Sequence, residues 1–113
     1  MLLNDLEKMV LKKCLESFDV YIKEEKLFFS DIQITERRFT GVGFFTDIEE
    51  SEKLRIEAKN PPRVWGDFYA RLNSTDDTGY LVFIENGYIN CIEGYTYEEV
   101  WPENIHKIEE FRP

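Results

Sequence analysis

Glu93 is the carboxylate in this sequence with the clearest chemical potential. Hairpin pairing is expected to place its side chain on the same side as three apolar residues, Val82, Ile84 and Cys91. Burial against apolar groups disfavours the charged form of a carboxylate and raises its pKa, which suits a general acid or base. The alternative, which we favour, is a rim carboxylate that faces solvent or accepts hydrogen bonds from the amides of 94–96.

Histidine and cysteine chemistry has little support in the sequence. His106 is the only histidine, lies among charged residues and has no spaced partner for a metal site, so we expect a surface residue. A Cys91–His106 nucleophile and base pair would need an exposed thiol and a third orienting group. The apolar pattern around Cys91 argues against that exposure. We therefore expect Cys14 and Cys91 to be buried free thiols, and we assign no catalytic residue, metal or cofactor.

Three acidic runs are candidates for contact with a positively charged partner. They are Asp47, Glu49, Glu50 and Glu52; Asp76 and Asp77; and Glu98 and Glu99. Their spacing is not that of a calcium loop, which needs a central glycine and a distal glutamate. We favour solvated loops and keep one alternative, a patch that mimics phosphates for a basic, nuclease-like partner.

Aromatic residues near these runs have two possible uses. Aromatics make up 15% of the 113 residues, and they serve either as core volume in a small domain or as anchors at an interface. We favour core packing for most of them. The candidate binding residues are Glu49, Glu50, Glu93, Tyr95, Tyr97, Glu98, Glu99 and Trp101.

Composition limits the possible partners. The formal net charge is −9, from 23 acidic against 14 basic residues, which argues against nucleic-acid binding and against an anionic membrane surface. A basic protein partner remains compatible, because opposite charge speeds association. No run is apolar enough to span a membrane and the start lacks a signal-peptide pattern, so we expect a cytoplasmic protein.

The first quarter of the chain predicts helix. Asn4 and Glu7 form a capping-box pattern. An apolar stripe at helical spacing follows: Leu3, Leu6, Val10, Leu11, Cys14, Leu15 and Phe18. Asp19 either caps a second helix or marks a bend, and the helical pattern continues to about Phe28.

The remainder predicts antiparallel strands. Strand-like segments are 32–39, 42–48, 64–72, 79–85 and 88–93. The first two should form a hairpin, and Gly43 suggests a bulge or a close backbone contact. We expect a loop over 49–62 with a short strand at 54–58, a turn at 73–78, an irregular stretch over 94–102, and a tail at 105–111 that is either an edge strand or a short helix.

The strongest local signal is Asn86-Gly87, the preferred pair for a two-residue type I′ turn. An uninterrupted hairpin about it would pair Ile84 with Ile89, Val82 with Cys91 and Tyr80 with Glu93. One face would then carry Val82, Ile84, Ile89 and Cys91, and the other would carry Leu81, Phe83, Tyr88 and Ile92. Because both faces are apolar, we expect both to be covered, one by the N-terminal helices and the other by a loop, a curled sheet or a partner.

Two segments resemble small bacterial proteins of unknown function. They are Phe39-Thr40-Gly41-Val42-Gly43-Phe44-Phe45-Thr46, and Glu93-Gly94-Tyr95-Thr96-Tyr97 followed by Trp101-Pro102. The resemblance covers about the last two-thirds of the chain and implies a helical start with an antiparallel sheet, but no activity. In size, charge and fold class the chain is also similar to the small acidic immunity proteins that neutralise bacterial toxins, although function does not follow from fold.

These observations predict a single α+β domain over 1–113, with an N-terminal helix or helix pair packed on an antiparallel sheet of about five strands. The functional hypothesis is a non-enzymatic, protein-binding protein, in one form an immunity protein. The alternative is a small enzyme or ligand-binding domain with a pocket around Glu93. That pocket would be lined by Tyr80, Glu93, Tyr95, Tyr97 and Trp101.

Overall fold

The computed structural model describes every residue except 99. One main helix, α1 (Asp5–Ser17), and a short helix, α2 (Glu25–Phe29), precede the sheet. The strands are β1 (Ile34–Phe39), β2 (Gly43–Ile48), β3 (Val64–Leu72), β4 (Asp76–Glu85), β5 (Tyr88–Thr96) and β6 (Ile108–Glu110). A 3₁₀ turn, η1 (Glu52–Leu54), lies between β2 and β3. The class is α+β, as the sequence predicts, with six strands rather than about five.

The capping box at the start of α1 forms as predicted. The Asn4 side chain accepts from the Glu7 amide, and the Glu7 carboxylate accepts from the Asn4 amide, each at 2.8 Å. The helix ends at Ser17, and Asp19 takes a positive φ of 64° instead of capping another helix. Helical structure resumes only at Glu25, so the continuous pattern expected up to Phe28 is interrupted.

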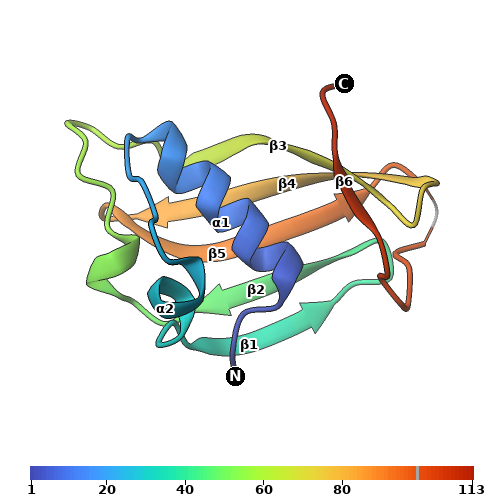
Figure 1. Cartoon of the computed structure of the whole chain (residues 1–113), viewed down its shortest axis with the longest axis horizontal. Helices are drawn as coiled ribbons and strands as arrows, with labels where there is room; N and C mark the ends of the chain where they lie inside the picture. Colours follow the sequence, from blue (N-terminus) through green and yellow to red (C-terminus); the bar gives the residue numbers. More distant parts are fainter. Residues whose placement is uncertain (99) are drawn as a thin grey trace.

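All six strands pair antiparallel in the order β1-β2-β5-β4-β3-β6. The predicted hairpin of the first two strands is confirmed. Figure 1 shows α1 crossing the near side of the sheet, with α2 on the same side. The tail forms an edge strand, β6, beside β3, which resolves the choice between strand and helix.

The Asn86-Gly87 turn closes the β4–β5 hairpin with positive φ at both residues, 53° and 86°. Ile84 pairs with Ile89 as predicted, but Asn90 is then an extra residue on β5, and Phe83 pairs with Cys91. This β-bulge moves every later residue of β5 by one position. The predicted pairings of Val82 with Cys91 and Tyr80 with Glu93 are therefore wrong.

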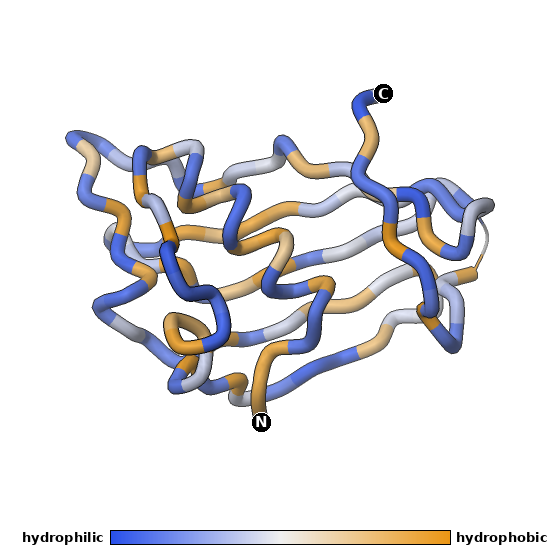
Figure 2. Tube along the Cα trace, in the orientation of Figure 1, coloured by the Kyte–Doolittle hydropathy of each residue, from blue (hydrophilic) through white to orange (hydrophobic). Residues whose placement is uncertain are grey.

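The corrected register separates the two sides of the sheet clearly. Leu81 pairs with Glu93, and Val82 pairs with Ile92. The side facing α1 holds the core, in which the fully buried residues of the central strands are Tyr80, Val82, Ile89 and Ile92. Figure 2 shows hydrophobic and hydrophilic residues alternating along α1 and the central strands. Ile92 thus lies in the core, and Cys91 lies on the opposite side.

Two connecting segments differ from expectation. The short strand expected at 54–58 is replaced by η1 and an isolated bridge between Arg55 and Tyr88. The stretch expected to be irregular from 94 is regular through Thr96, because β5 continues to pair with β2 and β4. No helix among the described residues is long and apolar enough to cross a membrane.

Candidate functional site

Both described α-helices, α1 and α2, lie on one side of the sheet (Figure 1), and we call the other side the open face. Its central residues are only partly buried, in contrast to the alternating residues that face α1. The central residues of the open face are Phe45, Leu81, Phe83, Cys91, Glu93 and Tyr95. No loop or curled sheet among the described residues fully covers this face in the way that the apolar pattern predicts. Cover by a partner, the third alternative, stays a prediction.

Glu93 lies in the middle of this face. It pairs with Phe45 on β2 and with Leu81 on β4, so apolar side chains flank it across three neighbouring strands. Among the described residues it forms no ion pair. The sequence-based expectation that Glu93 shares a side with Val82 and Ile84 is wrong, because the one-residue bulge moves the Glu93 side chain to the other side of the sheet.

Two arginines on the open face, Arg38 and Arg71, are matched by acids. Arg38 lies 3.1 Å from the Asp47 carboxylate, and Arg71 lies 2.6 Å from that of Asp77. Both pairs are partly exposed, so each contributes little to stability. Arg38 also lies over the Phe45 ring, 5.2 Å from its centroid, but the carboxylate that it pairs with is that of Asp47 and not that of Glu93.

Tyr95 and Tyr97 extend the open face beyond Glu93. Their rings meet edge to face with centroids 5.7 Å apart, and Tyr97 is 58% exposed. The Tyr95 ring lies over Gly79, where an added Cβ would come within 2.4 Å of the phenol oxygen. Burial, helped by Tyr97 and Glu93, raises the pKa of Tyr95 to about 12. The Tyr95 hydroxyl therefore stays protonated near neutral pH and can act as a hydrogen-bonding group.

The other candidate residues fall in different places. Glu98 is exposed just beyond β5, and its amide donates to the Thr96 hydroxyl at 2.9 Å. Glu49 and Glu50 are exposed at the opposite end of the face, where β2 finishes. Glu99 lies outside the described residues.

Trp101 belongs to the core on the helix side. It is 7% exposed, and its ring packs edge to face on Phe44 at 5.2 Å and on Tyr80 at 6.4 Å. The sheet therefore stands between Tyr80 and Trp101 on one side and Glu93 and Tyr95 on the other. The structure does not bring together the five residues of the pocket expected around Glu93.

The thiols and the histidine are poorly placed for nucleophilic chemistry. Cys14 is buried, as predicted, and Cys91 is only partly buried, but both are free thiols. Burial, together with the neighbouring Asp47 carboxylate, raises the pKa of Cys91 to about 12, so little thiolate exists near neutral pH. His106 is exposed just before the edge strand β6, and its amide donates to the Asn73 side chain at 2.9 Å, whereas Cys91 lies on β5, near the middle of the sheet.

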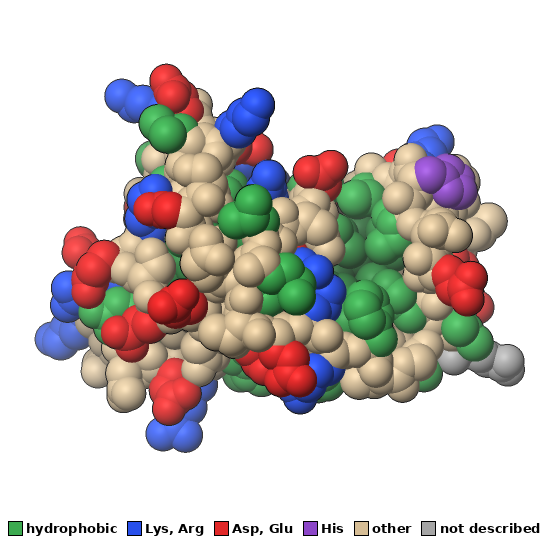
Figure 3. All heavy atoms as spheres, turned by 90° about the horizontal axis from the view of Figure 1, so that it is seen from below, with side chains coloured by type: hydrophobic (Ala, Val, Ile, Leu, Met, Phe, Trp, Pro, Cys, Tyr) green, Lys and Arg blue, Asp and Glu red, His purple; other side chains and the backbone are tan. Residues whose placement is uncertain are grey.

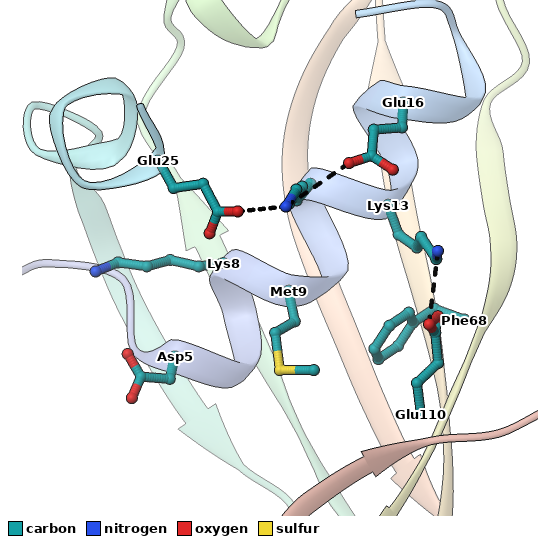
Figure 4. A pocket seen from close by; sticks show the side chains of 9 residues that line it. Asp5, Lys8, Met9, Lys13, Glu16, Glu25, Phe68 and Glu110 are labelled. Carbon is teal, nitrogen blue, oxygen red and sulfur yellow. Dashed lines mark hydrogen bonds and ion pairs between the residues drawn. The ribbon is translucent and has the colours of Figure 1, made fainter. Parts of the chain in front are cut away.

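A hollow of about 490 Å³ runs along the outer side of α1. Figure 4 shows that charged side chains from α1, α2 and β6 surround it. Lys12 pairs with Glu25 and, at 3.9 Å, with Glu16, while Lys13 lies 3.5 Å from Glu110. These pairs cancel most of the charge around the hollow, while Asp5 and Lys8, which also line it, form no ion pair among the described residues.

Sequence reasoning did not place Leu81, which pairs with Glu93, and Phe83, which pairs with Cys91, on the same side of the sheet as Glu93. The pattern assigned them to the face opposite Glu93, and a one-residue bulge reverses that assignment. The signal that could have located the bulge is Asn90, a polar residue that interrupts an otherwise apolar strand.

Comparison with known proteins identifies no relative: no protein-family model, curated protein or solved structure matches this chain. The resemblances noted in the sequence therefore remain expectations, and we infer a function from the geometry of the open face.

Proposed function

We propose that this chain is a non-enzymatic protein that binds a basic protein partner through the open face of its sheet. The observation that carries the proposal is the position of Glu93, a carboxylate without an ion-pair partner among the described residues, between Phe45 and Leu81. A lysine or arginine side chain of a partner would supply the missing charge, and its methylene groups would cover the neighbouring apolar surface.

The chemistry of the surrounding surface supports such a partner. Aromatic residues that present both an apolar ring and a polar tip are enriched at protein interfaces, and Tyr95 and Tyr97 lie next to Glu93. The net charge of −9 favours encounter with a basic protein, and the exposed acids Glu49, Glu50 and Glu98 lie around the rim.

Neutralisation of a basic toxin is one form of this function. The small size, acidity and α+β class support it as a proposal, and so does an acidic surface able to mimic phosphates. A gene for a toxin directly upstream of the gene for this chain is expected under this form. Its absence would leave protein binding as the proposal and remove the toxin as the partner.

The test compares capture of proteins from source cells by three immobilised full-length chains. They are the wild type, Glu93→Lys, and the matched control Glu57→Lys, which reverses the charge of an exposed loop residue. The wild type and the control should capture the same basic protein, and Glu93→Lys should reduce its affinity by about 100-fold, as expected when a desolvated charge pair becomes repulsive. Equal capture by all three chains, or capture of none, would overturn the proposal.

Cys91 provides an independent readout in the captured complex. It lies on the open face, where it pairs with Phe83 of β4, whereas Cys14 is buried in the core. Alkylation of Cys91 at mildly alkaline pH should slow when the partner is bound. Unchanged alkylation would place the partner on another surface.

Salt and rim charges should act on the association rate. Reversing Glu49 together with Glu50 should slow association and leave dissociation nearly unchanged, because exposed rim charges steer encounter over about 10 Å at moderate ionic strength. Truncation of Tyr97 to alanine should instead speed dissociation, since an aromatic contact is lost. Affinity that does not change with salt would contradict the electrostatic part of the proposal.

A further inference from the structure

A second candidate binding site lies on the other side of the sheet. It is a cleft of about 350 Å³ between the start of α1, the end of the β1–β2 hairpin and the segment that leads into β6. Figure 3 shows a hollow lined with hydrophobic side chains and bordered by basic and acidic ones. The apolar residues that line the cleft are Leu6, Phe39, Phe44, Trp101, Ile105 and Ile108.

The floor of the cleft is already formed. Phe44 and Trp101 are 4% and 7% exposed and pack edge to face at 5.2 Å, and the Trp101 amide donates to the Gly41 carbonyl at 2.8 Å. Phe39, by contrast, is 67% exposed, with its ring 6.4 Å from that of Phe44. A largely exposed aromatic ring therefore stands beside a rigid aromatic floor, which is the kind of surface that binds the apolar body of a small ligand.

The charges of the cleft favour a cation. Arg37 lines it, but its guanidinium is held by Glu7 at 2.6 and 2.9 Å, so the two charges cancel. Asp5 and Glu103 also line the cleft, are exposed, and form no ion pair among the described residues. Two carboxylates without partners next to aromatic rings attract an ammonium group both directly and through the ring faces.

We propose that this cleft binds a small organic amine, with its aromatic or short aliphatic body on Phe39, Phe44 and Trp101 and its ammonium group near Asp5 and Glu103. We commit to a free small molecule because three separate segments of the chain bound the cleft, and its volume is at the lower end of the range for small-molecule sites. The site lies on the opposite side of the sheet from Glu93 and does not depend on the proposed protein-binding function.

The test measures dissociation constants for three probes of similar shape and different charge: 2-phenylethylamine, 3-phenylpropionate and 2-phenylethanol. Binding is followed by NMR through the indole N–H signal of Trp101, assigned by comparison with a Trp65→Phe variant. The amine should bind with a Kd of about 1 mM or tighter, and about tenfold more tightly than the carboxylate. No binding of the amine, or equal affinity for all three probes, would overturn the proposal.

Two variants separate the role of charge from that of the aromatic wall. Asp5→Asn combined with Glu103→Gln should remove the preference for the amine, whereas Glu57→Gln, a matched control outside the cleft, should retain it. Phe39→Ala, which removes a largely exposed ring, should raise the dissociation constants of all three probes by about fivefold. If a lysine-containing peptide binds at the cleft and the free amine does not, the site belongs to a peptide, and the small-molecule proposal fails.

Discussion

At the scale of single residues, Glu7 shows how one side chain serves two purposes. It completes the capping box at the start of α1, and it is also fully buried beneath the cleft. There it accepts two hydrogen bonds from Arg37 and one from the Thr46 hydroxyl. A buried carboxylate is tolerable only with such complete hydrogen bonding. Glu7 therefore joins α1 to β1 and β2 and holds Arg37 in the cleft wall.

Removal of this charge should destabilise the whole domain. Glu7→Gln leaves the Arg37 guanidinium without its counter-ion, so we expect a loss of about 3–5 kcal/mol in the free energy of unfolding, the range for a broken buried pair. Urea denaturation followed by circular dichroism measures it. Glu36→Gln, which removes the exposed partner of Arg38, is the matched control and should cost less than about 1 kcal/mol. Similar losses of unfolding free energy in the two variants would show that the buried pair stabilises the fold no more than the exposed pair does.

At the scale of elements, the close approach of β2 and β5 explains the glycine in the middle of a strand-like segment. A Cβ added to Gly43 would lie 2.0 Å from the Gly94 carbonyl oxygen and 3.0 Å from the Tyr95 Cα. Both obstacles are backbone atoms, which cannot move aside without disturbing the pairing of the strands. The close backbone contact expected at Gly43 is thus present, and it aligns the strands that carry Phe45 and Glu93.

Gly43→Ala should therefore destabilise the sheet more than another glycine substitution in a strand. We expect a loss of about 1–3 kcal/mol, the usual range for overpacking. Gly66→Ala is the comparison, since its new Cβ would meet only the terminal Cδ2 of Leu81, at 2.6 Å. That methyl group can rotate away, so the loss should stay below about 1 kcal/mol. The midpoints of urea denaturation of the two variants measure this difference. An equal or larger loss of stability for Gly66→Ala would show that backbone crowding at Gly43 is not the cause.

At the scale of the whole molecule, the two sides of the sheet differ in what covers them. One side carries the helices, the core and the apolar cleft, and the other presents Glu93 and its aromatic neighbours to solvent. The radius of gyration is 13.6 Å, close to the value of about 13 Å for a compact domain of this length. Because the two candidate sites lie on opposite sides, substitutions at one can be tested without altering the other.

The buried core should make folding sensitive to alkaline pH. Burial raises the pKa of Cys14 from 9.0 to about 12 and also raises that of Tyr80, so both stay protonated in the folded chain while the unfolded chain ionises. Their contribution to stability is complete below about pH 9 and falls as pH rises, by about 1.4 kcal/mol per pH unit for each fully shifted group.

The measurement is the free energy of unfolding of the wild type and of Cys14→Ala between about pH 8 and pH 11. The variant should start lower, because a buried side chain is truncated, and should then decline less steeply above about pH 9. Tyr21→Phe is the control, since Tyr21 is 80% exposed and its removal should leave the slope unchanged. Parallel declines for wild type and Cys14→Ala would rule out a contribution from the buried thiol.

The sequence alone was sufficient for features that depend on neighbouring residues. The capping box of Asn4 and Glu7 and the turn at Asn86-Gly87 form as predicted, because hydrogen bonds and dihedral preferences within a few residues determine them. Alternation of apolar residues likewise located most strands and the α+β class. Glu93 and Tyr95 were named as candidates at this level from residue type, and their role stays a prediction.

Only the tertiary structure decided which side of the sheet each candidate occupies. One extra residue, Asn90, places Glu93 beside Leu81 and away from the core. Its polar side chain marks an interruption of the apolar pattern, but the packing of the strands fixes the register that results. Contacts between distant segments likewise placed Trp101 on Phe44 and joined Arg37 to Glu7. The physical reason is that strand register and burial depend on how the whole core packs, so they follow from the balance of many long-range contacts rather than from any short pattern.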